Sequence, residues 1–317
     1  MAYSSGGLIS ATDYNGFVGV SPSAVANTLN TVWAVGNGQY GYGQTSVAQV
    51  ASTNTITATQ WASLINPLNS IRVHQTGSGS GITATTAGQV ITYTAALSTS
   101  ISSAYTSALV AATRSAVSTA VGGSFTAAWT SATTASTLTR GVGLKATFAS
   151  ADQARYFFNA GGQIKYNISA AQNASTTART NEIIALTAML GGVATFASTT
   201  NGGRTGTGGT LTTNNTAIGY YGTTTANVTV VGATSTTANY TSDTGTITIL
   251  SNGVQGANAD KGTILSFWTN ISSTSGGNSG GSFNDAFGVT FTMTIDVTYP
   301  EVVSLTNSWG TITVSQL

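Results

Sequence analysis

The chain has 317 residues but no cysteine, a single histidine (His74), and charged side chains at only 5% of its positions. Without cysteine it has no disulfide framework and no thiolate chemistry, and one histidine cannot support a zinc site. Soluble domains usually carry charge on about a quarter of their residues. The surface must therefore depend on Thr, Ser, Asn and Gln, as is common in proteins that work inside a large assembly or outside a cell.

The charges that are present nearly cancel, and the formal net charge is +1. This balance gives no electrostatic footprint for nucleic acid or anionic lipid. No apolar run approaches the roughly 18 residues of a membrane span, so we expect no membrane insertion. The opening "MAYSSGGLISATDYNGF" lacks the basic and apolar regions of a secretory signal, so we expect synthesis in a cytoplasm.

One stretch matches a nucleotide-binding pattern. "GNGQYG", residues 36–41, reads as G-x-G-x-x-G, but it follows a predicted helix instead of a strand. The acid that such a site needs about 20 residues later is missing, since no Asp or Glu stands between Asp13 and Asp152. We interpret the stretch as a turn-rich loop and expect no cofactor.

Hydrolytic sites are equally poorly supported. His74 stands at the expected end of a helix, without a G-x-S-x-G elbow, and is interpreted as a half-exposed polar residue. A glycosidase needs two carboxylates at a fixed separation, and Asp285 and Asp296 are the pair considered, although no spacing enforces their meeting. Asp243 and Asp260 lie in turn-like sequence, which Asx turns explain. We predict no catalytic residue and no metal site, and therefore a protein that is not an enzyme.

Residues 1–76 are predicted to form a helical N-terminal assembly segment. One helix follows Ser21 and Pro22, and a second, over residues 59–72, is kinked or split by Pro67. Both are short and amphipathic, so their apolar faces need a partner surface. We expect neighbouring subunits to supply it, through the assembly residues Val25, Leu29, Trp33, Trp61, Leu64, Ile65 and Leu68.

The next part, residues 77–136, is rich in Gly, Ser, Thr and Ala. Its start, within "TGSGSGITATTAGQ" at residues 76–89, has the composition of a flexible linker. The Ala-rich run at residues 100–121 is predicted to be a helix whose polar face is supplied almost wholly by Ser and Thr.

Residues 137–201 are predicted to form a small α+β unit around the motif "RYFFNAGGQI" at residues 155–164. A short helix begins at Ser150 or Asp152 and ends at Gly161, and a strand, a helix and another strand follow. We expect the aromatic rings to be buried, a positive φ at one motif glycine, and an ion pair from the motif arginine to Asp152. The structural motif comprises Arg155, Tyr156, Phe157, Phe158, Asn159, Gly161 and Gly162.

From residue 202 to residue 317 the pattern is β throughout. Six β-branched, alternating runs bounded by turns, the first of them "TAIGYYG" at residues 216–222, predict an antiparallel sandwich or barrel. The chain as a whole is thus predicted to be α+β, mostly β. Three aromatic residues within polar surroundings are possible contacts for surface glycans: Tyr220, Tyr221 and Trp268.

Several stretches resemble a family of tailed-bacteriophage virion structural or tail-fibre-like proteins. They are "FASADQARYFFNAGGQIKYNIS" followed by "TNEIIALTAMLGGVATF", the opening "ATDYNGF" with "ITATQWASLINPLNSI", and the late "FGVTFTMTIDVTYP". The resemblance touches both ends and the middle of the chain, whereas residues 98–136 lie outside it.

The resemblance implies a non-enzymatic structural component of a virion, made in the host cytoplasm. Such a component would assemble with itself, as a trimer if it is fibre-like, and with other virion proteins on the tail, collar or fibre. A neck or capsid-surface position is the alternative place. A receptor-binding adhesin for host glycans remains a second class, and a depolymerase a third.

Overall fold

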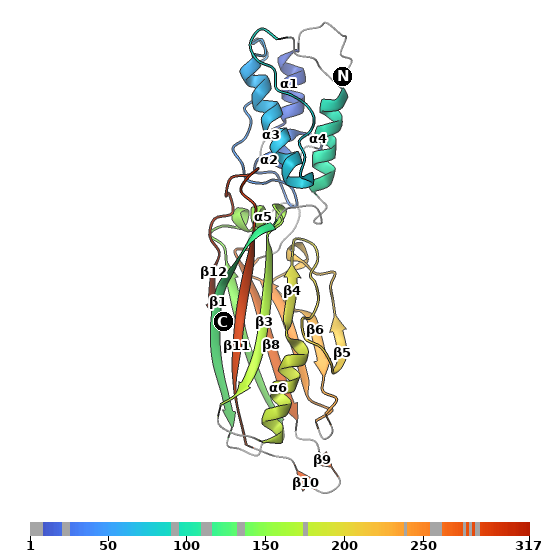
Figure 1. Ribbon diagram of the computed structural model, residues 1–317, viewed down its shortest axis with the longest axis vertical. Helices are drawn as coiled ribbons and strands as arrows, with labels where there is room; N and C mark the ends of the chain where they lie inside the picture. Colours follow the sequence, from blue (N-terminus) through green and yellow to red (C-terminus); the bar gives the residue numbers. More distant parts are fainter. Residues whose placement is uncertain are drawn as a thin grey trace.

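The computed structural model describes residues 9–20, 26–89, 95–108, 116–131, 137–173, 177–237, 240–253, 262–274, 277–278, 281–282 and 286–317. The molecule is a rod with a helical head at one end and a β-sandwich at the other (Figure 1). With 27% helix, 33% strand and two large antiparallel sheets, the fold is α+β and mostly β, as the sequence predicts.

Four helices make up the head: α1 (Ala11–Val18), α2 (Leu29–Trp33), α3 (Ala58–Thr76) and α4 (Ala95–Ala108). Capping boxes start two of them, with Ser10 and Asp13 at α1 and Thr57 and Gln60 at α3. Helix α3 continues through Pro67 as one helix, so of the two predicted outcomes, a kink or a split, the split is wrong. It ends where Gly77 adopts the left-handed conformation.

The apolar faces of the head helices are covered by the head itself. Leu29 and Trp61 are 1% and 2% exposed, and Leu64, Ile65 and Leu68 are fully buried. Contacts of α3 with α2 and α4, and of α2 with α1, enclose them. The prediction that neighbouring subunits bury these faces is therefore wrong. Trp33 is partly buried and donates to the Thr45 carbonyl oxygen, and Val25 lies outside the described residues.

The segment after α3, predicted to be a flexible linker, is attached to α3 by one side chain. Asn69 Oδ1 accepts from the Ser80 backbone N–H at 2.9 Å, and Asn69 Nδ2 donates to the Ile82 carbonyl oxygen at 3.0 Å. A residue in the middle of the helix therefore holds the returning chain against it.

Two antiparallel sheets form the sandwich. The smaller has the order β1-β11-β3-β4 and the larger β12-β2-β8-β7-β6-β5. Alternate residues along β11, from Phe287 to Val297, are buried, as expected for a strand with one face on a core. The bounds are β1 (Ala116–Ser131), β2 (Thr137–Thr147), β3 (Gln163–Gln172), β4 (Gly192–Phe196), β5 (Thr210–Asn214), β6 (Val228–Thr234), β7 (Thr244–Ser251), β8 (Ile264–Thr274), β11 (Phe287–Pro300) and β12 (Thr313–Gln316).

Smaller elements complete the sandwich. Helix α6 (Ala178–Leu190) packs against β3 and β11 of one sheet and β6, β7 and β8 of the other. It begins after the Thr177 cap and stops at the left-handed Gly191. The short pieces β9 (Gly277–Asn278) and β10 (Gly281–Ser282) lie at the end of the rod away from the head (Figure 1).

The structure corrects three expectations about the strands. Residues 116–131 form β1, which pairs with β11 along its whole length, so the helix predicted over residues 100–121 does not reach residue 121; α4 is described to Ala108, and residues 109–115 lie outside the described residues. The predicted α+β unit is not separate, since β2 lies beside β8 and β3 beside β11. The run "TAIGYYG" contains the 3-10 turn Tyr220–Gly222 instead of a strand. Beyond Leu190 the described residues contain no α-helix, which confirms the predicted change to β structure.

None of the described helices combines the length and the apolar character that a membrane crossing requires.

Candidate functional site

The short helix α5 (Ala151–Asn159) lies between the head and the sandwich (Figure 1). The Ser150 hydroxyl caps it by accepting from the Gln153 N–H at 3.1 Å. At its other end Gly161 has φ +93°, and the Gly162 N–H donates to the Phe157 carbonyl oxygen at 2.8 Å. The predicted cap and the predicted positive φ are both confirmed.

The three consecutive aromatic residues of α5 are buried, as predicted. Tyr156 is 8% exposed, and Phe157 and Phe158 are fully buried. Phe158 stacks on Tyr220 with ring centroids 4.4 Å apart, and Phe157 and Phe158 both contact the ring of Phe148. The helix is therefore anchored in the top of the sandwich core, at about 1.5–3 kcal/mol for each large side chain that is buried.

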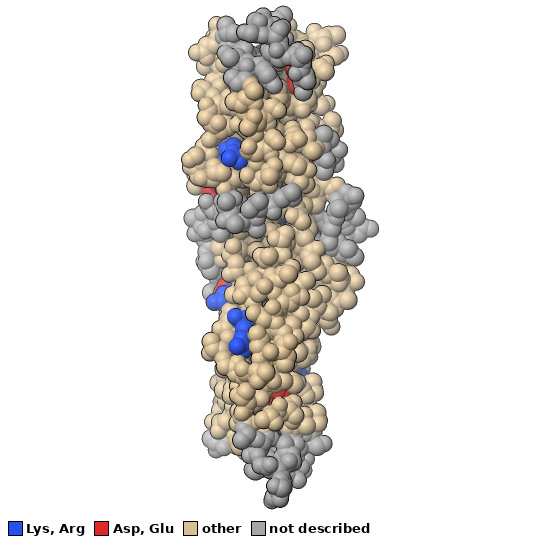
Figure 2. Space-filling view, turned by 90° about the vertical axis from the view of Figure 1, so that its right-hand side faces the viewer, with Lys and Arg blue, Asp and Glu red and all other residues tan. Residues whose placement is uncertain are grey.

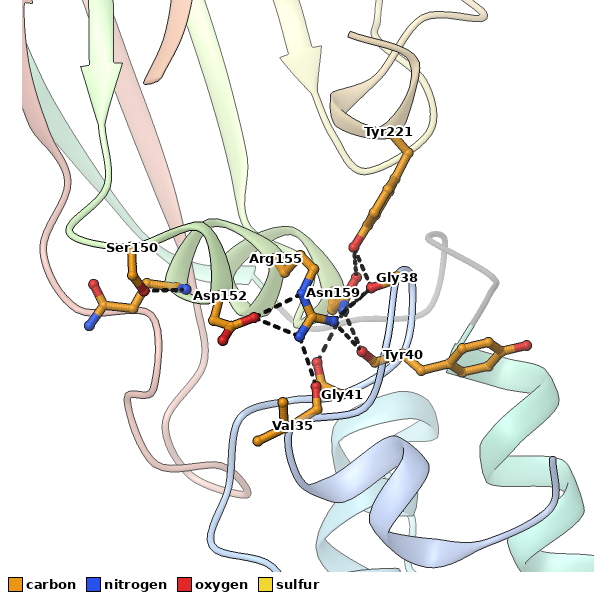
Figure 3. Close-up of polar contacts among 10 residues, drawn as sticks. Val35, Gly38, Tyr40, Gly41, Ser150, Asp152, Arg155, Asn159 and Tyr221 are labelled. Carbon is orange, nitrogen blue, oxygen red and sulfur yellow. Dashed lines mark hydrogen bonds and ion pairs between the residues drawn. The ribbon is translucent and has the colours of Figure 1, made fainter. Parts of the chain in front are cut away.

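Arg155 points from α5 towards the head (Figure 3). Its guanidinium pairs with Asp152 at 2.9 Å, the predicted ion pair, and lies over the Tyr156 ring. It also donates to three backbone carbonyl oxygens of the head, those of Val35, Gly38 and Tyr40, each at 3.0 Å. One side chain thus connects the two parts of the rod.

Two further side chains reach the same loop (Figure 3). Asn159 Nδ2 donates to the carbonyl oxygens of Gly38, Tyr40 and Gly41 at 3.0–3.1 Å. The Tyr221 hydroxyl lies 2.7 Å from the Gly38 carbonyl oxygen and 2.8 Å from Asn159 Oδ1. We call this group the latch: Arg155, Asn159 and Tyr221 with the carbonyl groups of Val35, Gly38, Tyr40 and Gly41.

The latch explains the glycines of "GNGQYG". Gly36, Gly38 and Gly41 all have positive φ. A Cβ atom on Gly41 would lie 2.1 Å from the Val35 carbonyl oxygen, so only glycine fits there. The interpretation as a turn-rich loop is confirmed, but its role as an acceptor for α5 was missed, because the donors stand more than a hundred residues away.

The electrostatics of the latch fit a structural role. Burial lowers the pKa of Arg155, but the bond to Asp152 and the negative field of its neighbours outweigh burial, and the pKa is raised. Burial also raises the pKa of Tyr156, and the charge of Asp152 adds to the effect. Arg155 therefore stays charged at any ordinary pH and does not act as an acid or a base.

His74 makes a second connection between head and sandwich. It is fully buried, which overturns the interpretation as a half-exposed residue, and Nε2 lies 3.0 Å from the Ala160 carbonyl oxygen. Its other ring nitrogen faces Glu301 in the segment after β11. The end of α3, the end of α5 and the end of β11 therefore meet at one imidazole.

The three aromatic residues suggested as glycan contacts do not share a surface role. Tyr220 is 2% exposed and stacked on Phe158, so the prediction of a glycan contact there is wrong. The Tyr221 hydroxyl belongs to the latch. Trp268 on β8 is half-buried, and its Nε1 donates to Asn270 Oδ1 at 2.7 Å.

Of the acids considered for catalysis, only some lie among the described residues, so the pair of Asp285 and Asp296 stays untested. Asp285 and Asp260 lie outside the described residues, while Asp296 on β11 accepts from Asn167 Nδ2 at 3.0 Å. Within the described ranges no three His, Asp or Glu side chains gather as a metal site would require.

Comparison with known proteins adds no relative to this picture: no family model, no curated protein and no solved structure gives a significant match.

Proposed function

We propose that the chain is a non-enzymatic structural subunit of a tailed-phage particle, assembling with itself on the tail, collar or fibre. The observation that carries the proposal is the latch, which joins an α-helical head and a β-sandwich into one rod (Figure 3). A chain that bears mechanical load or sets a distance needs a joint that cannot bend. The charged donor and the buried acceptors of the latch supply such a joint, since breaking it would strand a buried charge.

The surface supports the same proposal. Figure 2 shows only a few scattered charged side chains among the described residues of one face. Some apolar side chains are exposed as well. In the loop after β11, Val302 is 61% exposed and Val303 is 91% exposed. When a surface carries few charges, charge repulsion between copies is weak. Such a surface suits a subunit that is packed among copies in a particle.

The sandwich also supplies an edge for assembly. β1 is the outer strand of its sheet, and among the described strands its ladder partner is β11. Its 16 residues include neither a charged residue nor a proline, the usual devices that protect an edge from pairing with another chain. Since the head helices bury their own apolar faces, self-association is better assigned to the sandwich than to the head.

The test is the mass of the purified full-length chain in solution, followed by its location in the particle. We expect light scattering to give a closed oligomer, and labelled antibody against the chain to decorate the tail, collar or fibre in electron micrographs. A chain that stays monomeric at high concentration and depolymerises a host polysaccharide would overturn the proposal.

A further inference from the structure

A cleft of about 550 Å³ lies in the segment that joins β11 to β12. This segment runs along the side of the rod that carries β1, β12 and the C-terminus (Figure 1). The rings of Tyr299, Pro300 and Trp309 line the cleft. Val302 and Val303 also line it, and they are the two most exposed large apolar side chains among the described residues. A cleft and a protruding apolar side chain therefore belong to the same stretch of chain.

The loop that carries the two valines is fixed by Glu301. Its Oε2 accepts from the backbone N–H of Val303 at 2.6 Å and from that of Ser304 at 3.3 Å. Its Oε1 lies 3.1 Å from Nδ1 of the buried His74. The loop is thus tied in a conformation that keeps Val303 in water. A side chain fixed in this way loses little conformational freedom when a partner covers it.

Several polar groups of the cleft are engaged within the chain. Both carboxylate oxygens of Glu301 have partners, so neither is left over for a cation. The Tyr299 hydroxyl accepts from the Ile312 N–H at 3.3 Å, and Asn307 Oδ1 accepts from the Gly310 N–H at 2.8 Å. An apolar side chain suits this cleft better than a cation or a polar ligand, because rings form much of the lining.

The surroundings of the cleft favour another copy of the same chain over a charged partner. Residues 302–317 contain no charged side chain, and neither does β1. The two segments are close, since a Cβ atom on Gly122 in β1 would lie 2.8 Å from the Val314 side chain in β12. This side offers a charged partner little to pair with, whereas two copies can approach each other here without charge repulsion.

This side is also large enough for a specific interface. The 16 residues of β1 extend over about 50 Å at about 3.3 Å per residue, and packed sheets lie about 10 Å apart. The side that β1 and β12 form therefore covers about 500 Å² on each copy. Two copies would bury about 1,000 Å² together, which is the size that a specific interface needs.

We propose that copies of the chain lie side by side and in the same direction, with Val303 of each inserted into the cleft beside Trp309 of its neighbour. The inference rests on the proposed function, because it names the surface through which the subunit meets its own kind. The valine and the cleft lie at one height on the rod, so copies that share a direction bring each valine to a neighbouring cleft. The arrangement closes around an axis that runs along the rod.

The test is the mass of the full-length chain in solution, measured by light scattering over a range of concentrations. Val303→Asp places a charge where apolar surface should be covered. Because Val303 is 91% exposed in the single chain, the variant should fold normally. We expect its association constant to be at least about 30-fold lower than that of the natural chain, as for a residue at the centre of an interface.

Leu211→Asp is the matched control. Leu211 is also a large exposed aliphatic residue, and it lies on β5, at the edge of the larger sheet opposite to β12. The variant should associate like the natural chain.

A second measurement uses the absence of cysteine from the natural chain. A Val303→Cys chain is mixed with a Thr311→Cys chain, whose changed residue is exposed and lines the cleft, and the mixture is oxidised mildly. We expect disulfide-linked pairs of the two chains, because a disulfide requires the two side chains to lie close together. Val303→Cys mixed with Leu211→Cys should give far fewer pairs.

The outcomes separate this inference from the proposed function. A natural chain that stays monomeric at every concentration overturns both. An oligomer that survives Val303→Asp, or one that Leu211→Asp dissociates instead, overturns the inference alone and leaves a subunit that assembles through another surface.

Discussion

His74 Nδ1 lies 3.1 Å from Glu301 Oε1, and the two residues are 227 positions apart in the chain. The histidine is fully buried and the glutamate 7% exposed. Since the other ring nitrogen faces the Ala160 carbonyl oxygen, both nitrogens have an acceptor in front of them. Only the imidazolium form offers a proton to each. The head is thus joined to the sandwich by a buried ion pair as well as by the latch.

This pair predicts a loss of stability in acid. Burial raises the pKa of Glu301, but the hydrogen bond from His74 and the N–H of Val303 outweigh burial, and the pKa is lowered below its ordinary value. A carboxyl group with a depressed folded-state pKa contributes stability above its unfolded pKa and loses it as the pH falls through the folded one. The free energy of unfolding, measured in urea from about pH 6 to pH 2, should fall most steeply below the ordinary Glu pKa of about 4.3.

The matched variant for this experiment is Glu301→Gln. It should be less stable than the natural chain at neutral pH, because His74 loses its counter-charge. Its stability should also change less between neutral and acid pH. Parallel pH profiles for the two chains would show that Glu301 does not set the acid limit.

Arg155→Lys should weaken the joint although the charge is kept. A lysine ammonium cannot bond to Asp152 and to the carbonyl oxygens of Val35, Gly38 and Tyr40 at once, so several buried acceptors lose their donor. We expect the free energy of unfolding to fall by about 2–4 kcal/mol, measured in urea. Arg140→Lys, at an exposed position on β2, is the control and should change it by less than about 0.5 kcal/mol. An Arg155→Lys chain as stable as the control would contradict the role given to the latch.

Local signals were sufficient for the elements that surround the motif. Ser150 and Gly161 mark the ends of α5, and Gly191 marks the end of α6, because caps and left-handed glycines act within a few residues. The alternation in β3 and β11 likewise shows in the sequence, since one face of each strand is buried.

The features that the sequence did not predict depend on contacts between residues far apart in the chain. The helix predicted over residues 100–121 overlaps the start of β1, which forms because residues 116–131 pair with β11 from Ala116 opposite Pro300 to Ser131 opposite Phe287. The bond from Arg155 to Gly38 spans 117 residues, and no local pattern reveals it. The burial of His74 and of the apolar faces of the head helices also depends on contacts between distant residues, so the sequence did not predict it.

Gly162→Ala should be costly, although its backbone conformation is open to any residue. A Cβ atom there would lie 2.5 Å from the ring of Phe157, which is fully buried and cannot move aside. Overpacking of this kind costs about 1–3 kcal/mol, to be measured as the change in the free energy of unfolding. Gly222→Ala is the matched control, because its Cβ would meet Ile218 at an ordinary 3.5 Å, and it should stay within about 0.5 kcal/mol. Equal effects of the two variants would show that α5 can shift to make room.

Leu64→Ala distinguishes a self-contained head from one that is completed by neighbouring subunits. Leu64 is fully buried within its own chain, so truncation should cost about 2–5 kcal/mol through the cavity it leaves. The loss should be the same at every protein concentration and the oligomer mass unchanged, because stability that comes from assembly depends on concentration.

Val303→Ala is the control for this experiment, because Val303 is 91% exposed. It should leave the free energy of unfolding of the single chain within about 0.5 kcal/mol of that of the natural chain.

One outcome would contradict the prediction. If the effect of Leu64→Ala shrinks as the concentration rises and the oligomer dissociates, α3 lies at the subunit interface, and self-association belongs to the head and not to the sandwich.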